Sequence, residues 1–172
     1  MQNNEFESKF ALMLTGDEEA FTYVYNETKK PVYTIINRIV NNRCESEDIM
    51  QDLFLRLITK TDLDIIKNPR AYIFMMARNM AIDSLRKDHP DYLDEDVTDR
   101  ENSSFDEHIC LTSSIEDAIL QLDIKEREVI SLHINAGMKF REISEYLGEP
   151  PGTLRSRYSL AIKKLRSIMK EG

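Results

Sequence analysis

Apolar residues recur at the spacing of an α-helix along most of this 172-residue chain, and this periodicity restricts its possible folds more than any other feature. The chain contains no run of alternating β-branched residues, which would be typical of a strand. Glycine and proline, which interrupt helices, contribute only five residues each. We therefore predict an all-α fold.

The first half of the chain is expected to form four helices. They are predicted to begin near Asp17, Pro31, Ser46 and Pro69. Proline suits the first position of a helix because it has no N–H to donate there, and Ser46 and Asn68 are predicted N-caps. The first two helices are expected to end near residues 28 and 40, and the fourth near residue 87.

Helical spacing is lost after residue 88 and resumes at residue 114. The stretch HPDYLDEDVTDRENSSFDEH between them is acidic and rich in turn-forming residues, which predicts a flexible linker. We expect two small helical domains, residues 5–88 and 114–171, joined by residues 89–113. The predicted helices of the second domain cover residues 114–121, a segment from a capping box at Asp123 and Glu126 to Gly137, residues 140–147 and residues 151–169.

The net charge of −8 is concentrated in one part of the sequence. Residues 1–88 carry a net charge of −2, residues 89–117 carry −9 and residues 118–172 carry +3. An acidic chain as a whole argues against a nucleic-acid-binding protein, because such proteins are usually basic. Here the acidic excess lies in and beside the linker, so the basic C-terminal domain stays a candidate for DNA binding.

The last two predicted helices are separated by a short turn that contains Gly148, which is the pattern of a helix-turn-helix. In this motif the N-terminal residues of the second helix contact bases, and basic residues hold phosphates. The residues of the second helix expected to face the core are Leu154, Tyr158, Ala161, Ile162, Leu165, Ile168 and Met169. The predicted base-reading residues are Arg155, Ser156 and Ser159. The small residue Thr153 is expected to allow close approach of the helix to the DNA duplex. The predicted phosphate contacts are Arg157, Lys163, Lys164 and Arg166.

Two alternatives stay open for this helix. Its basic side could be an ordinary solvated surface rather than a DNA-binding one. Leu160 projects to the exposed side, where it would contact either a thymine methyl group or another protein.

The third and fourth predicted helices present two further candidate faces. In SEDIMQDLFLRLI, the face opposite the apolar stripe carries Asp48, Gln51, Asp52 and Leu55, which suits a protein partner or a solvated surface. The fourth helix, PRAYIFMMARNMAIDSLRK, is apolar on two sides, so we expect it to be buried between neighbours. Its remaining side would hold an unstacked base or form a buried polar network, and it carries Tyr72, Asn79, Asp83 and Arg86.

These two helices, the acidic linker and the segment REISEYLGEPPGTLRSRYSLAIKKLR, in this order, resemble a bacterial RNA polymerase sigma factor of the extracytoplasmic-function group. The resemblance covers about residues 17–169. It implies that the chain binds core RNA polymerase and directs promoter-specific transcription initiation. It also implies an anti-sigma factor as a partner.

The resemblance further assigns roles to residues. It implies contact with the core polymerase at Asp48, Gln51, Asp52 and Arg56. We add the neighbouring Leu55 to these predicted contacts. It implies that the −10 promoter element is recognised and melted by Tyr72, Arg78, Asn79, Asp83 and Arg86, and the neighbouring Lys87 is added to this set. It also implies that residues 60–67 capture a flipped-out base. In the −35 reader, Arg155, Ser156 and Arg157 occupy matching positions, whereas Tyr72 stands where the family usually has Trp, and Leu160 and Ile162 stand where basic residues are frequent.

Other classes of function fit the sequence less well. The histidines His89, His108 and His133 are scattered and lack the further ligands of a zinc site, so we expect no enzyme activity, no cofactor and no small-molecule substrate. No apolar run is long enough to insert into a membrane, no secretory signal is visible, and the two cysteines are far apart, so we expect a cytoplasmic protein. The remaining alternative is a helix-turn-helix regulator that acts without core polymerase and binds palindromic duplex DNA by itself.

Overall fold

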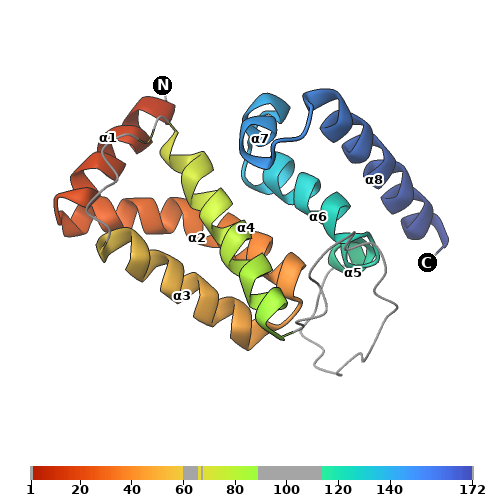
Figure 1. Ribbon diagram of the computed structural model, residues 1–172, viewed down its shortest axis with the longest axis horizontal. Coiled ribbons are helices and arrows are strands. Elements are labelled where there is room, and N and C mark those ends of the chain that lie inside the picture. Colours follow the sequence, from red (N-terminus) through yellow and green to blue (C-terminus); the bar gives the residue numbers. More distant parts are fainter. Residues whose placement is uncertain (1, 60–65, 67, 89–113, 172) are drawn as a thin grey trace.

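The computed structural model describes residues 2–59, 66, 68–88 and 114–171, and every regular element in these residues is helical. The predicted all-α fold is therefore confirmed. Figure 1 shows the first four helices grouped on one side and the remaining helices on the other. The helices are α1 (Gln2–Leu14), α2 (Glu18–Val40), α3 (Arg43–Thr59), α4 (Pro69–Asp88), α5 (Ser114–Leu120), α6 (Ile124–Ile130), the π-helical turn η2 (Ser131–Asn135), α7 (Phe140–Leu147) and α8 (Pro151–Glu171).

Helix α4 is the central element of the N-terminal group and packs against α1, α2 and α3. Its apolar residues are buried on more than one side, as the sequence predicts, with Ile73 and Phe74 both completely inaccessible. Asn68 caps α4 through its Oδ1, which accepts a hydrogen bond from the Ala71 amide at 3.1 Å. The predicted Asn68-Pro69 helix start is confirmed.

Two predictions about the N-terminal helices were wrong. Helix α2 is continuous, with Pro31 in its interior rather than at the start of a separate helix. The missing N–H of this proline removes one hydrogen bond, but Val24 before it and Ile35 after it are buried in the same core, which holds the helix together. Helix α1, which the sequence pattern did not indicate, contributes Phe6 to that core.

The predicted N-cap of α3 was also misplaced. The helix begins at Arg43, and the Oδ1 of Asn42 accepts from the Glu45 amide at 3.2 Å. Ser46 lies one turn inside the helix, where its hydroxyl donates to the Asn42 carbonyl oxygen at 2.5 Å. Asn42 takes the N-cap position because Asn41 adopts a left-handed conformation (φ 53°) and ends α2 immediately before it.

The C-terminal helices follow the predicted pattern closely. The capping box of α6 is present, since Asp123 accepts from the Glu126 amide at 2.8 Å and Glu126 accepts from the Asp123 amide at 3.3 Å. Gly148 ends α7 with a φ of 70°, a left-handed conformation that glycine adopts without steric cost. The segment expected to be one helix up to Gly137 instead changes from α to π geometry at Ser131.

One apolar core runs through both groups of helices. It joins Phe74 and Leu53 of the N-terminal group to Val129, Leu132 and Ile143 of the C-terminal group. The predicted linker, residues 89–113, lies outside the described residues. Within the described part of the chain, no helix combines the length and the apolar content that a membrane crossing requires.

Candidate nucleic-acid interface

The helix-turn-helix positions the start of α8 on the surface. Leu154 and Ala161 are completely buried and fix the orientation of α8 against α6 and α7. Beneath the motif, His133 stacks on Phe140 with ring centroids 4.2 Å apart, and its Nδ1 lies 2.7 Å from the Met138 carbonyl oxygen. The histidine therefore has a packing role in this structure.

The residues predicted to read bases lie on the exposed side of α8. Arg155, Ser156 and Ser159 are all exposed, as are the predicted contacts Thr153, Lys163 and Arg166. Leu160 is 55% exposed, in agreement with its predicted direction, but Met169 is 49% exposed and does not belong to the core stripe to which it was assigned. The last turns of α8 extend beyond the helices that cover its start (Figure 1), which leaves Met169 without a core to enter.

Two of the predicted phosphate contacts bind carboxylates of this chain. Arg157 donates to both carboxylate oxygens of Glu149, at 3.0 and 2.6 Å, and these hydrogen bonds raise the pKa of Arg157. Lys164 places its Nζ 2.6 Å from Glu126 and 3.9 Å from Asp123, and the hydrogen bond to Glu126 raises the pKa of the lysine. Both side chains thus brace α8 against the preceding turn and against the start of α6.

The polar side of α4 is mostly exposed. Asn79, Asp83, Arg86 and Lys87 are exposed, and Asp83 lies 3.8 Å from Arg86. The alternative of a buried polar network therefore does not apply to Asn79 and Asp83. Tyr72, nearer the start of α4, is half-buried and packs against the core.

Arg78 of α4 contacts the C-terminal helices. Its Nε donates to Oε1 of Glu128, on α6, at 2.5 Å, and its Nη1 donates to Asn79 at 3.1 Å. Burial raises the pKa of the Glu128 carboxyl, and the Arg78 guanidinium opposes this shift. The side chain of Arg78 is 23% exposed and that of Glu128 only 4%.

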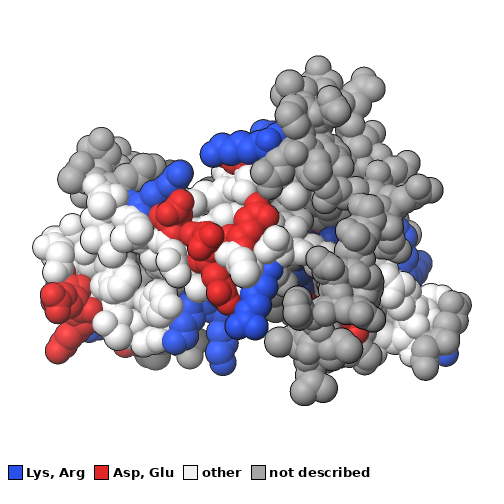
Figure 2. Space-filling view, turned by 90° about the horizontal axis from the view of Figure 1, so that it is seen from below, with Lys and Arg blue, Asp and Glu red and all other residues white. Residues whose placement is uncertain are grey.

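The predicted protein-binding face of α3 is on the surface. Its members are all exposed, namely Asp48, Gln51, Asp52, Leu55 and Arg56. Leu55 is 59% exposed and Ile58, which the sequence analysis did not select, is 51% exposed. Seen from below, from the side on which α3 lies in Figure 1, the molecule shows acidic side chains gathered near the middle of the view with basic ones beside them (Figure 2). This combination of apolar and charged exposed side chains suits a protein partner.

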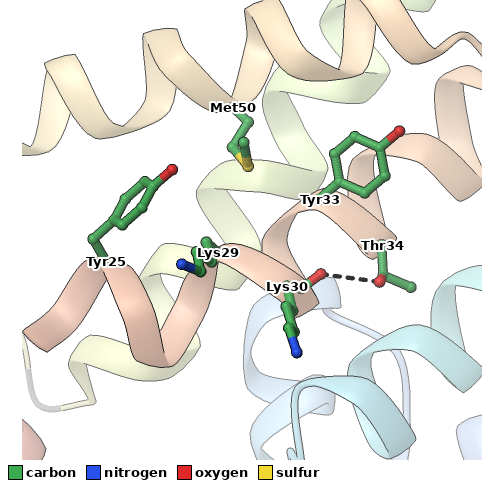
Figure 3. Close-up of a pocket in the computed structure, with 6 residues that line it drawn as sticks. All are labelled: Tyr25, Lys29, Lys30, Tyr33, Thr34 and Met50. Carbon is green, nitrogen blue, oxygen red and sulfur yellow. Dashed lines mark hydrogen bonds between the residues drawn. The ribbon is translucent and has the colours of Figure 1, made fainter.

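A shallow hollow lies beside this face, between α2 and α3. It has a volume of about 390 Å³ and is open to the surface. Figure 3 shows Met50 of α3 above the two lysines of α2 that line it, and a hydrogen bond of 2.9 Å from the Thr34 hydroxyl to the Lys30 carbonyl oxygen. The lining residues are Tyr25, Lys29, Lys30, Tyr33, Thr34 and Met50.

Arg38 is the site residue that sequence reasoning missed. It lies on α2 between Ile36 and Ile39 and is 4% exposed. An arginine among apolar residues on the core side of a helix is the one signal by which it could have been selected, because such a residue needs partners. Its guanidinium donates to Glu116, Ser131 and Asn135, all of which lie in the C-terminal helices.

Several residues discussed from the sequence lie outside the described residues. They include the predicted base-capturing loop, residues 60–67, of which Ile66 alone is described, and also His89, His108 and Cys110. Within the described ranges, no three His, Cys, Asp or Glu side chains are grouped as a metal site would require.

Two family models match the chain. The model described as Sigma-70 region 2 matches residues 24–89, and the model described as Sigma-70, region 4 matches residues 112–165. The ECF RNA polymerase sigma factor SigW of Bacillus subtilis is 30% identical over 172 residues, which cover 91% of this chain and 92% of that protein. The ECF RNA polymerase sigma factor SigL of Mycobacterium tuberculosis is 27% identical over 160 residues, which cover 86% of this chain and 88% of that protein.

Two solved structures share the fold. CnrH, in complex with the cytosolic domain of CnrY, matches with a TM-score of 0.67 and 19% identity over 95% of this chain and 96% of that one. The sigma factor RpoE of Bartonella quintana, in complex with the anti-sigma factor NepR, matches with a TM-score of 0.62 and 21% identity over 96% and 97%. The arrangement of helices described above is thus one that these two proteins also adopt.

Proposed function

This chain belongs to the ECF sigma factors, which direct promoter-specific transcription initiation by RNA polymerase, and we propose how its surfaces divide that work. The division follows three exposed faces, on α3, α4 and α8. Residues 5–88 form the domain that binds core polymerase and the −10 element, and residues 114–171 form the domain that binds the −35 element. The chain is an initiation factor of the polymerase and has no reaction of its own.

The α3 face docks on core polymerase. Leu55 provides exposed apolar area at the centre of this face, and Asp48, Asp52 and Arg56 provide charges around it. An apolar centre surrounded by charges gives a protein interface its affinity from burial and its selectivity from charge complementarity. RpoE is bound to an anti-sigma factor in its solved complex, and an anti-sigma factor of this chain would inhibit it by covering this face.

The α4 face holds the −10 element. Tyr72 supplies a ring for stacking on an unstacked base, and Asn79 and Arg86 supply hydrogen bonds to bases and backbone. The carboxylate of Asp83 accepts rather than donates hydrogen bonds, so it is suited to an exocyclic amine of a base. Opening of the duplex leaves bases available to these groups.

The α8 face reads the −35 element. Arg155, Ser156 and Ser159 at its exposed N-terminal end contact base edges, and Lys163 and Arg166 contact phosphates. Arg157 and Lys164 keep their carboxylate partners and hold the motif in shape, or exchange them for phosphate on binding. The observation that carries this proposal is the exposure of Arg155, Ser156 and Ser159 on a helix whose opposite side, at Leu154 and Ala161, is completely buried.

Run-off transcription with purified bacterial core polymerase tests the proposed function. The chain should support initiation from a subset of genomic fragments that core polymerase alone does not use. The chain without polymerase should bind the same fragments weakly, because its C-terminal segment, residues 118–172, carries a net charge of only +3. Tight binding of palindromic duplexes by the chain alone, with no initiation on any fragment, would overturn the proposal and favour a polymerase-independent regulator.

A further inference from the structure

Arg70, in the first turn of α4, joins three helices of the N-terminal group. Its guanidinium lies over the Phe6 ring of α1, with Cζ 4.4 Å from the ring centroid. Its Nη2 donates to Oε2 of Glu27, on α2, at 2.9 Å. A planar guanidinium can stack on a ring and bind a carboxylate at the same time, which the compact ammonium of a lysine does less well. The start of α4 is thus connected to α1 and α2 through one side chain.

This contact is part of the packing of the N-terminal group rather than a loose surface pair. The Phe6 ring is buried and also lies beside Tyr23 of α2, with ring centroids 6.5 Å apart. Figure 1 shows the beginnings of α1 and α4 next to one another. The ion pair of Arg70 with Glu27 is partly exposed and contributes little by itself. The stacking on Phe6 is the second interaction that fixes the guanidinium.

Arg70 lies on the opposite side of α4 from the proposed −10 face. Successive residues of a helix are about 100° apart around its axis, so Arg70 is about 160° away from Tyr72. Asn79 and Asp83 lie within about 20° of Tyr72 on the same count. DNA bound along Tyr72, Asn79 and Asp83 is therefore out of reach of Arg70. Any effect of this arginine on the −10 element has to pass through the backbone of α4.

The turn that carries Arg70 also carries Tyr72. Asn68 closes this turn twice, because its Oδ1 accepts from the Ala71 amide at 3.1 Å and its carbonyl oxygen accepts from the Tyr72 amide at 3.0 Å. A displacement of this hydrogen-bonded turn would move the Tyr72 ring with it. Stacking on a base depends on the position of the ring, and a ring that is already in place loses little conformational freedom when the base arrives.

We propose that Arg70 is a positioning residue for promoter opening, because its contacts with Phe6 and Glu27 hold the start of α4 where Tyr72 can stack on a base that leaves the duplex. The inference rests on the proposed function, since it takes the α4 face as the −10 reader. It gives α1 and α2 a part in promoter opening from the side of α4 that is remote from the DNA. Arg70 and Glu27 act as a pair, and neither contacts a base.

The test compares Arg70→Gln, Glu27→Gln and the double variant in the full chain with purified core polymerase. Arg43→Gln on α3 is the matched control, because Arg43 pairs with Glu47 at 3.0 Å and the Glu47 side chain is as exposed as that of Glu27, at 45%. The DNA is a genomic fragment on which the parent chain supports run-off transcription. Permanganate reactivity of unpaired thymines measures promoter opening, and fluorescence anisotropy measures the affinity for core polymerase. Circular dichroism confirms that the variants are folded.

We expect Arg70→Gln and Glu27→Gln each to lower the extent of promoter opening about threefold to tenfold, as the loss of one partly exposed ion pair with its ring contact implies. The double variant should be no worse than Arg70→Gln, since both substitutions remove the same contact. Arg70→Lys should recover part of the opening, because lysine keeps the charge that faces Glu27 but not the planar stacking. Affinity for core polymerase should stay unchanged in all of these variants, and Arg43→Gln should open the promoter normally.

Normal opening by Glu27→Gln, together with a loss in Arg70→Gln, would overturn the positioning role, because it would assign Arg70 to a direct contact with DNA. Equal losses of opening and of core affinity would overturn it as well, since they would show a general loss of structure. If every variant opened the promoter normally, the proposed function would stand and the positioning role alone would be wrong. If the parent chain supported initiation on no fragment, both would be wrong.

Discussion

Arg157 donates two hydrogen bonds to the carboxylate of Glu149, at 3.0 and 2.6 Å, and so ties α8 to the turn that precedes it. These hydrogen bonds stabilise the ionised carboxylate, and they hold the pKa of Glu149 below its ordinary value of 4.5. Because the pKa is lower in the folded than in the unfolded chain, the pair contributes stability above about pH 4.5. That contribution is lost as the pH falls through the folded-state pKa.

Glu149→Gln should lower the free energy of unfolding by about 1 kcal/mol at pH 7, since it weakens a charge-assisted pair that is only partly buried. The difference from the parent chain should shrink as the pH falls below about 4.5, where Glu149 of the unfolded chain takes up a proton, and it should vanish once the pH is below the folded-state pKa. Urea unfolding followed by circular dichroism at pH 7 and at pH 3.5 measures both values. Glu145→Gln is the matched control, because Glu145 is exposed and lies 3.8 Å from Arg141, which is also exposed. A Glu149→Gln deficit that is the same at both pH values would contradict the assigned cause.

Asp123→Ala should destabilise the chain by about 1 kcal/mol, because it leaves the Glu126 amide at the start of α6 without its acceptor. Asp123→Asn should be nearly neutral, since asparagine caps helices as well as aspartate does. Thermal unfolding of the three proteins distinguishes the capping role from the longer contact between Asp123 and Lys164. Equal losses in the alanine and asparagine variants would assign the stability to charge rather than to the cap.

The local structure of the chain was predictable wherever a signal lies within a few residues of its effect. The capping box at Asp123, the Asn68-Pro69 helix start and the end of α7 before Gly148 are of this kind, and each is confirmed. The prediction that a helix starts at Pro31 was wrong because it used local propensity alone. The packing of α2 against α4 keeps the helix continuous through this proline. Tertiary packing outweighed the loss of one hydrogen bond.

Arg155→Ala and Lys163→Ala should weaken promoter binding in different ways. Loss of a bidentate base contact at Arg155 should cost about 1–3 kcal/mol and relax the preference at one −35 position. Loss of Lys163 should weaken binding evenly across sequences and lower its salt dependence, since a phosphate contact carries no base information. Selection of −35 sequences from a randomised library by the reconstituted holoenzyme, at two salt concentrations, measures both effects. Identical losses on all sequences for the two variants would refute this division of roles.

Leu55→Lys should reduce the affinity for core polymerase at least tenfold, which corresponds to about 1.4 kcal/mol, because it places a charge in the apolar centre of the α3 face. Stability should change little, since the side chain is 59% exposed. Leu12→Lys on α1 is the control, as Leu12 is also exposed, at 45%, but belongs to a different helix from the proposed interface. Fluorescence anisotropy with labelled chain measures the affinity. Equal affinity for both variants would remove Leu55 from the interface.

The site was predictable from the sequence as a set of faces but not as a set of contacts. Helical periodicity alone placed Leu55, Asp83 and Arg155 on the surface, and all three are exposed. The pairing of Arg78 with Glu128, and of Arg38 with Glu116, joins residues separated by 50 and 78 positions. No periodicity specifies which helix faces of two distant segments meet, so these contacts follow from tertiary packing and could not be predicted.

The π-helical turn between Ser131 and Asn135 also sets the direction of everything that follows it. The Ala136 amide donates to the carbonyl oxygen of Ser131 at 3.0 Å, five residues earlier, so this turn contains one residue more than an α-helical turn. Deleting one residue here would restore an α-helical turn, and it would rotate α7 and α8 by about 100° relative to α2. The orientation of α8 relative to α2 therefore depends on the number of residues in this turn. A one-residue deletion here would change that orientation without altering any residue proposed to contact DNA.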